Sequence, residues 1–261
     1  MTAIALRMVE VDLLKLRKKR STVIWALFLA LVPVLIFFVV NAIQHASDPS
    51  KHGPAGGVEN FHTGLRLLGG LLFGPLVAIL IGVEAGTNDA SAGVFRELVV
   101  TGRSRLALFA SRVPAALALC WSIIIAGYAL ILLGTFVFAG SEPTPDGALI
   151  LNGLAFLLLA TGVLCVVAVG FSSLIISKPG AIIALIAWQI VATPLVSSIK
   201  SLGGGRDFVL YVALAHFSPI KLDGGKGTEI SLAAGTAVAV IALWLAVFLA
   251  LGAWRTRTMD A

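Results

Sequence analysis

Six long stretches of the chain contain no Asp, Glu, Lys or Arg, and this feature limits the fold more than any other. A helix that crosses a bilayer needs about 20 predominantly apolar residues, because lipid offers no hydrogen-bond partner to an exposed backbone. Only 12% of the 261 residues are charged and 59% are hydrophobic, whereas about a quarter of a soluble domain is charged. We therefore predict an all-α polytopic membrane protein with one transmembrane domain. The expected transmembrane helices, which extend some of these stretches into their flanks, cover residues 22–42, 66–87, 105–139, 148–177, 179–199 and 230–254.

The basic residues predict the orientation of these helices. Six crossings place both termini on one side of the membrane, and about two thirds of the 19 Lys and Arg residues fall on that side. Because Lys and Arg are enriched in cytoplasmic segments of membrane proteins, we expect both termini in the cytoplasm. The apolar core of the first helix is longer than that of a typical signal peptide and no A-x-A site follows it, so we expect this helix to be retained.

The N-terminal residues 4–20 have the pattern of an amphipathic helix in the membrane interface. Four apolar side chains share one face of this expected helix: Leu6, Val9, Leu13 and Leu16. We interpret the segment as an elbow helix that positions the first crossing. A plain basic anchor on the cytoplasmic side is the alternative.

The predicted cytoplasmic loop between the second and third crossings contains a second amphipathic segment. We expect a helix over residues 89–101, with Asn88 or Asp89 as its N-cap and Gly102 directly after it. Its apolar face consists of Val94, Phe95, Leu98 and Val99, while Arg96 and Glu97 lie on the opposite face. Such a helix is suited to docking a cytoplasmic partner; an interfacial helix without a partner is the alternative.

The outer segment over residues 201–229 contains an apolar run, Phe208–Phe217, that is too short to cross the membrane. Ten helical residues cover about 15 Å, half of a hydrocarbon core of about 30 Å. We expect a re-entrant extracellular segment that acts as a gate at the outer end of a transport path. The alternative is a helix that lies on the outer membrane surface.

Three short motifs follow one another around the cytoplasmic loop. They are Glu84-x-Gly86-Thr87, Glu97-Leu-x-x-Thr-Gly-Arg-Ser-Arg105 and Leu108-x-x-Ser-Arg112. This order, together with the N-terminal helix, the six crossings and His216-Phe-Ser-Pro219 before the last crossing, resembles the ABC-2 type transporter permease family over essentially the whole chain. These proteins are the membrane subunits of many ABC exporters.

The resemblance implies a multi-pass protein of the bacterial plasma membrane that dimerises and contacts two copies of a separate ATP-binding subunit. The 89–101 helix would then be a coupling helix, seated in a groove of the ATPase. The residues implied for this coupling are Val94, Phe95, Arg96, Glu97, Leu98, Val99, Arg103 and Arg105. The motif at the end of the second crossing contributes Glu84, Gly86 and Thr87.

The chain lacks sequence motifs for chemistry of its own. ATP hydrolysis requires a G-x-x-x-x-G-K-[ST] loop, and residues 224–228 have these residue types without the spacing. We therefore expect no cofactor on this chain, with ATP and Mg²⁺ bound by the partner subunit. No H-E-x-x-H or G-x-S-x-G motif occurs, and His45, His52 and His62 lie in an irregular loop without a Cys partner. Neither a catalytic site nor a metal site is expected.

Polar residues in the fifth crossing share one helical face. Gln189, Thr193, Ser197 and Lys200 follow one another at steps of four, four and three residues. Two interpretations stay open: the first three residues line a substrate path or a subunit seam, or they form hydrogen bonds between helices.

Glycines in the second crossing predict close packing of helices. Gly70-x-x-x-Gly74 and Gly82-x-x-x-Gly86 have the spacing that permits two helix backbones to approach each other. Pro75 in the same stretch is expected to kink the helix.

The function that the sequence favours is that of a permease subunit of an ABC exporter, which moves an amphiphilic substrate such as a lipid or a drug out of the cytoplasm. Its expected partners are two ATP-binding subunits, a second permease subunit in a homodimer and the lipid bilayer, and no nucleic acid. The alternative is a membrane scaffold or accessory subunit that uses the loop helix to bind a partner without transport. A membrane enzyme acting on lipid is disfavoured, since catalytic motifs are missing from the sequence.

Overall fold

The computed structural model describes residues 2–91, 104–175, 177–222 and 232–258. Within these ranges all regular structure is helical, which confirms the predicted all-α class. The elements are α1 (Thr2–Lys18), α2 (Arg20–Ser47), α3 (Gly57–Gly69), α4 (Phe73–Ser91), α6 (Arg105–Val137), α7 (Gly147–Ser172), α8 (Lys178–Ala187), the π-helical turn η1 (Trp188–Ala192), α9 (Thr193–Ser198), the 3₁₀ segment η2 (Lys200–Phe208), α10 (Leu210–Ala215) and α11 (Ala234–Thr258).

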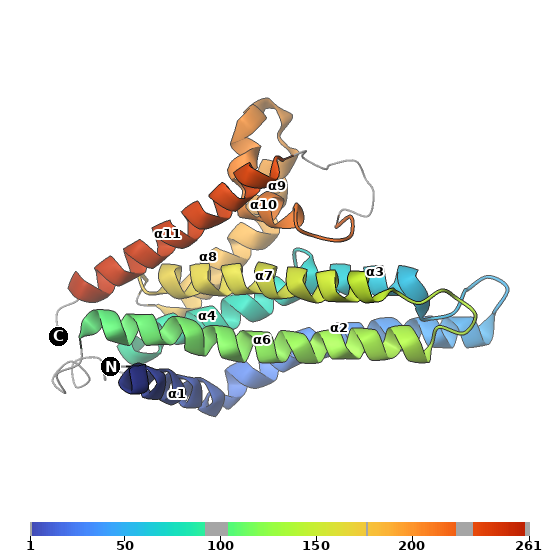
Figure 1. Ribbon diagram of the computed structural model, residues 1–261, viewed down its shortest axis with the longest axis horizontal. Helices are drawn as coiled ribbons and strands as arrows, with labels where there is room; N and C mark the ends of the chain where they lie inside the picture. The colour runs from blue at the N-terminus through green and yellow to red at the C-terminus, as the bar shows by residue number, and fades with distance from the viewer. Residues whose placement is uncertain (1, 92–103, 176, 223–231, 259–261) are drawn as a thin grey trace.

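Six helical stretches among the described residues are long and apolar enough to cross a membrane, as the sequence predicts. They are Arg20–Ser47, Gly57–Asn88, Arg105–Val137, Gly147–Ser172, Lys178–Ser198 and Ala234–Thr258. Helices α2, α6 and α7 run along the long axis of the molecule, and α11 lies obliquely to them (Figure 1). Helix α1 lies at the end of the bundle at which α11 ends (Figure 1). We refer to this end as the α1 end, and to the opposite end, where α2 ends and α7 begins, as the far end.

The second crossing consists of two helices, α3 and α4, whereas the sequence predicts one helix over residues 66–87. Gly70 follows α3 with a ψ of −148°, which takes the chain out of the helical conformation. Gly74, at the start of α4, lies so close to α3 that an added Cβ would be 1.9 Å from the Leu68 carbonyl oxygen. The break therefore requires glycine at a position where the two helix ends touch.

The first half of this crossing, α3, begins at Gly57, nine residues before the predicted start at Arg66. Gly57 has a φ of +84°, a left-handed conformation that other residues rarely adopt. Phe61, Leu65 and Leu68 are fully buried on one face of α3. Glu59 and Arg66 lie in this helix, so most of it falls outside the uncharged stretch from which the crossing is predicted.

The core of the molecule lies where α4 packs on α7. A Cβ on Gly82 would be 2.6 Å from the Cys165 carbonyl oxygen, and one on Gly86 would be 2.7 Å from the Val169 carbonyl oxygen. The two backbones are therefore in direct contact, and the close packing predicted from this glycine pair is confirmed.

The fifth crossing is one helical stretch, but it is not a regular α-helix throughout. Helix α8 ends at Ala187, the chain makes one wide π-helical turn, and α9 continues from Thr193. Pro194 in the first turn of α9 has no N–H, so it cannot donate the helical hydrogen bond to the preceding turn. The π turn inserts an extra residue into the helix, which changes the direction in which the side chains after it point.

The short apolar run after the fifth crossing contains helix α10. Leu210, Ala213 and Leu214 are buried there. The Trp244 indole N–H of α11 donates to the Phe208 carbonyl oxygen at 2.9 Å, just before α10. Residues 223–229 of the predicted outer segment lie outside the described residues.

Helix α1 packs against α6 and precedes α2, with Lys19 between them in a non-helical conformation. The predicted apolar face is only partly covered. Leu16 is buried, Val9 and Leu13 pack against the core, and Leu6 is exposed.

Candidate functional site

A buried carboxylate joins three helices near the α1 end. Glu84 of α4 is only 3% exposed. Its Oε2 atom accepts a hydrogen bond from the Thr22 hydroxyl of α2 at 2.6 Å and forms an ion pair with the Lys178 ammonium at the start of α8. We call Thr22, Glu84 and Lys178 the Glu84 cluster. Because a buried charge is stable only when it is paired, this cluster ties α2, α4 and α8 together.

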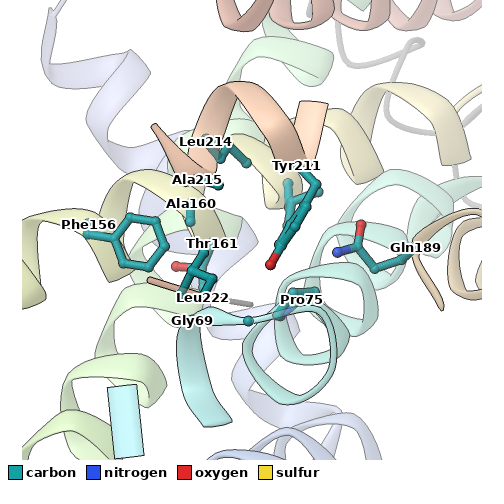
Figure 2. A pocket seen from close by; sticks show the side chains of 12 residues that line it. Gly69, Pro75, Phe156, Ala160, Thr161, Gln189, Tyr211, Leu214, Ala215 and Leu222 are labelled. Atoms are coloured by element: carbon teal, nitrogen blue, oxygen red, sulfur yellow. The ribbon is translucent and has the colours of Figure 1, made fainter. Parts of the chain in front are cut away.

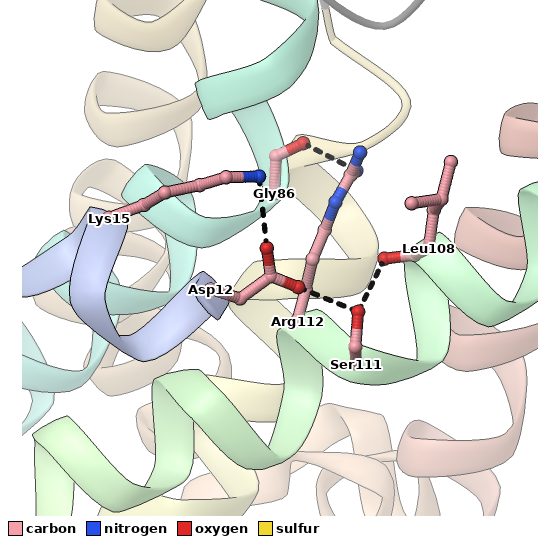
Figure 3. Close-up of polar contacts among 6 residues, drawn as sticks. All are labelled: Asp12, Lys15, Gly86, Leu108, Ser111 and Arg112. Carbon is pink, nitrogen blue, oxygen red and sulfur yellow. Dashed lines mark hydrogen bonds and ion pairs between the residues drawn. The ribbon is translucent and has the colours of Figure 1, made fainter. Parts of the chain in front are cut away.

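A second polar cluster joins α1, α4 and α6 (Figure 3). The Asp12 carboxylate of α1 pairs with Lys15 at 3.1 Å and accepts a hydrogen bond from the Ser111 hydroxyl of α6 at 2.6 Å. Arg112, which is 5% exposed, points its guanidinium toward the Gly86 carbonyl oxygen of α4, with Nη1 at 3.5 Å. We call Asp12, Lys15, Gly86, Ser111 and Arg112 the Asp12 cluster.

The motif residues at the end of the second crossing are all buried. Gly86 faces α7, where an added Cβ would be 2.0 Å from the Ser172 hydroxyl oxygen. The Thr87 hydroxyl donates to the Val83 carbonyl oxygen at 2.7 Å within α4. The predicted motif residues Glu84, Gly86 and Thr87 thus lie together at the junction of α4 with α2, α7 and α8.

Most of the residues predicted to contact an ATPase lie outside the described residues: Val94, Phe95, Arg96, Glu97, Leu98, Val99 and Arg103. Arg105 is described, and its Nη1 donates to the Arg257 carbonyl oxygen of α11 at 3.0 Å. Ser104 caps α6 by accepting from the Ala107 N–H at 3.1 Å. The sequence predicts that Asn88 or Asp89 starts a new helix. This prediction is wrong, because α4 continues through Ser91 and both residues lie within its last turn.

A pocket lies beside the middle of α7, between the break in the second crossing and α10 (Figure 2). We call it the Gln189 pocket; its lining residues are Gly69, Gly70, Pro75, Phe156, Ala160, Thr161, Leu164, Gln189, Tyr211, Leu214, Ala215 and Leu222. The volume open to the centre of a water molecule is about 10 Å³, which corresponds to about one water. The closed pocket therefore has a mostly apolar lining and very little free space.

The polar residues predicted to share a face of the fifth crossing lie in and after the π turn. Gln189 is 3% exposed and lines the pocket, and Thr193 is 2% exposed but is not part of the lining. The Ser197 hydroxyl donates to the Thr193 carbonyl oxygen at 2.7 Å, inside its own helix. Of the three residues, Gln189 is the one in the described lining of the Gln189 pocket.

A wider hollow lies at the far end, between the end of α2, the loop after it and the start of α3. Its volume is about 660 Å³, and its lining includes Asn41, His52, Glu59 and His62. Asp48 lies in the same loop, and hydrogen bonds to its carboxylate lower its pKa, with the larger effect from Ser50 and the smaller from Lys51. Among the described residues no three His, Cys, Asp or Glu side chains lie close enough together to hold a metal ion.

No protein-family model matches the chain, and no curated protein matches it either.

The partners within the two polar clusters could not be identified from the sequence. Glu84 and Lys178 are 94 positions apart, and Asp12 and Ser111 are 99 positions apart. One available signal is that Asp12 is an acidic residue in a strongly basic N-terminal segment. Tyr211 and Thr161 lie in apolar runs, where a hydroxyl gives no sign of the pocket that it will line.

Proposed function

We propose that the chain is the transmembrane permease subunit of an ATP-driven exporter of amphiphilic molecules. It works in the bacterial plasma membrane, with both termini in the cytoplasm, as a homodimer that contacts two copies of a separate ATP-binding subunit. The six apolar helical stretches and the excess of basic residues on the terminal side support this proposal. The resemblance to ABC-2 type permeases supplies the kind of partner.

The observation that carries the proposal is the pair of polar clusters near the α1 end. The segment between α4 and α6 is the expected docking element. The end of α4 precedes it and the start of α6 follows it. The Glu84 cluster connects α4 with α2 and α8, and the Asp12 cluster connects α4 and α6 with α1. A force on the docking segment would therefore reach five helices through polar contacts that are buried or partly buried, as coupling to an ATPase requires.

Two further parts of the proposal concern the ends of the transport path. Helix α1 acts as an interfacial elbow, which its exposed basic residues and its contact with α6 support. Helix α10 and the residues up to Leu222 act as an outer gate. The support is that α10 lines a pocket beside the middle of α7, too deep for a helix that lies on the outer surface.

Reconstitution with ATPases tests the proposal directly. The chain is co-purified with each free-standing P-loop ATPase of the same organism, placed in liposomes and assayed for Mg-ATP hydrolysis and for ATP-dependent movement of fluorescent lipids and dyes. We expect one ATPase to bind stably and to hydrolyse ATP faster with the chain than without it. Stable binding without stimulated hydrolysis or transport would instead favour the scaffold function.

A further inference from the structure

The side-chain amide of Gln189 lacks a hydrogen-bond partner for its Nε2 atom among the described residues. The residue is 3% exposed, and its amide nitrogen points toward the Gln189 pocket (Figure 2). A buried amide donor without a partner costs free energy. The pocket therefore has a built-in donor for a group that carries an acceptor.

The pocket lies where three irregular segments of the chain meet. Gly69 and Gly70 belong to the break between α3 and α4, Gln189 belongs to the π turn, and Tyr211 belongs to the short helix α10. Broken helices are tolerated at membrane depth where they are buried in protein or line a cavity. In transporters such breaks frequently form the substrate site.

The chemistry of the lining restricts what the pocket can hold. Its described lining residues include no Asp, Glu, Lys, Arg or His, and the side chains around Gln189 are mostly apolar. An ion without a counter-charge is strongly disfavoured in such surroundings. The Thr161 hydroxyl donates to the Leu157 carbonyl oxygen at 2.6 Å, so its oxygen presents lone pairs and not a proton. Among the described lining residues the Gln189 amide is a donor without a partner, and the group it fits is a neutral oxygen.

We propose that the Gln189 pocket binds an uncharged amphiphile through one oxygen of a hydroxyl, ether or ester group. Gln189 Nε2 donates to this oxygen, which takes the place of about one water, and the apolar part of the ligand packs against Phe156, Leu214 and Leu222. Because the closed pocket has so little free volume, α10 must shift to admit the apolar part. That this ligand is the exported cargo rests on the proposed function, whereas its binding does not.

Photolabelling of the chain alone in phosphatidylcholine nanodiscs tests the site, with octanol that carries a diazirine as the probe. We expect saturable labelling of α10 or of the π turn, displaced by 1-octanol and not by n-octane or octanoate. In Gln189→Leu, which keeps the volume and removes the donor, half-saturation should move to a concentration about fivefold to tenfold higher. Ser197→Ala, on the same crossing but outside the pocket, should label like the wild type.

Three results would overturn the site: labelling that does not saturate, displacement by octane or octanoate as effective as by octanol, or unchanged half-saturation in Gln189→Leu. The pocket would then hold water only. The competition uses the wild-type chain, so it remains decisive if Gln189→Leu fails to enter nanodiscs. Saturable labelling without any ATPase partner would contradict the proposed function but support the binding site. An ATPase partner without saturable labelling would contradict the binding site but not the proposed function.

Discussion

Glu84 is a carboxylate that three helices hold almost out of contact with solvent. A single oxygen, Oε2, takes both the Thr22 hydroxyl and the Lys178 ammonium. Removing one partner of a buried ion pair is costly because the remaining charge stays buried. The Lys178 side chain is 37% exposed. If the ammonium is removed, water can therefore replace part of the stabilisation that it gives to the Glu84 carboxylate.

Lys178→Met should therefore destabilise the protein by about 2 kcal/mol, less than the loss expected for a fully buried pair. The measurement is the thermal denaturation midpoint of the purified chain in detergent. Lys178→Met combined with Glu84→Gln should recover most of the loss, because no charge is then left buried.

The matched control for this pair is Lys51→Met. Lys51 pairs with Asp48 at 2.9 Å, but its side chain is 78% exposed, and exposed pairs contribute about 0–1 kcal/mol. Equal effects of Lys51→Met and Lys178→Met would show that the Glu84 cluster has no special role in stability.

At the scale of the elements, the sequence predicts where helices cross, but it places the bend of the second crossing at Pro75, whereas the helix breaks between Gly69 and Phe73. Long uncharged stretches predict crossings because each helix satisfies its backbone hydrogen bonds within its own segment, so the prediction needs no knowledge of the neighbouring helices. The breaks depend on contacts between segments. Gly70 and Gly74 bring α3 against α4, and α7 occupies the space beside them. The π turn at Gln189 has no comparable sequence signal apart from Pro194, so the sequence predicts a regular helix there.

The contact between α4 and α7 gives a prediction about Gly86. In Gly86→Ala the new Cβ would meet the Ser172 hydroxyl and the Val169 carbonyl oxygen, so α4 has to move away from α7. Overpacking of this kind costs about 1–3 kcal/mol, which a lower thermal midpoint in detergent would report. The control is Gly235→Ala in α11, where an added Cβ has no heavy atom within 4 Å. That variant should be neutral or slightly stabilised, and a loss equal to that of Gly86→Ala would contradict the packing explanation.

The docking segment gives a prediction that the sequence alone supports. Phe95→Asp places a charge on the expected apolar face, so it should abolish ATPase binding or reduce the stimulation of ATP hydrolysis at least tenfold in the reconstituted complex. Phe95→Leu keeps the face apolar and should retain most of the activity. Size-exclusion chromatography checks that both variants keep the oligomeric state of the unaltered chain. Normal stimulation in Phe95→Asp would exclude this face as the docking surface.

For the whole molecule, the described helices agree with the charge pattern on one point. Helix α1 lies at the end of the bundle at which α11 ends, so the six crossings return the chain to the side on which it started (Figure 1). Basic side chains are also concentrated near this end, in the last turns of α1 and of α11. The positive-inside rule predicts that this end lies in the cytoplasm, in which case the polar clusters would face the compartment that contains ATP.

Thiol labelling in intact cells tests this orientation. Ser50→Cys and Ser141→Cys place a thiol at exposed positions of the far end, and Thr258→Cys places one at the exposed end of α11. The native Cys120 and Cys165 are both fully buried, so they should add little background. An impermeant maleimide should label the first two variants in intact cells and the third only after the membrane is opened. Labelling of Thr258→Cys alone in intact cells would reverse the orientation. The docking segment would then face away from ATP, and the ATP-driven function would fall with it.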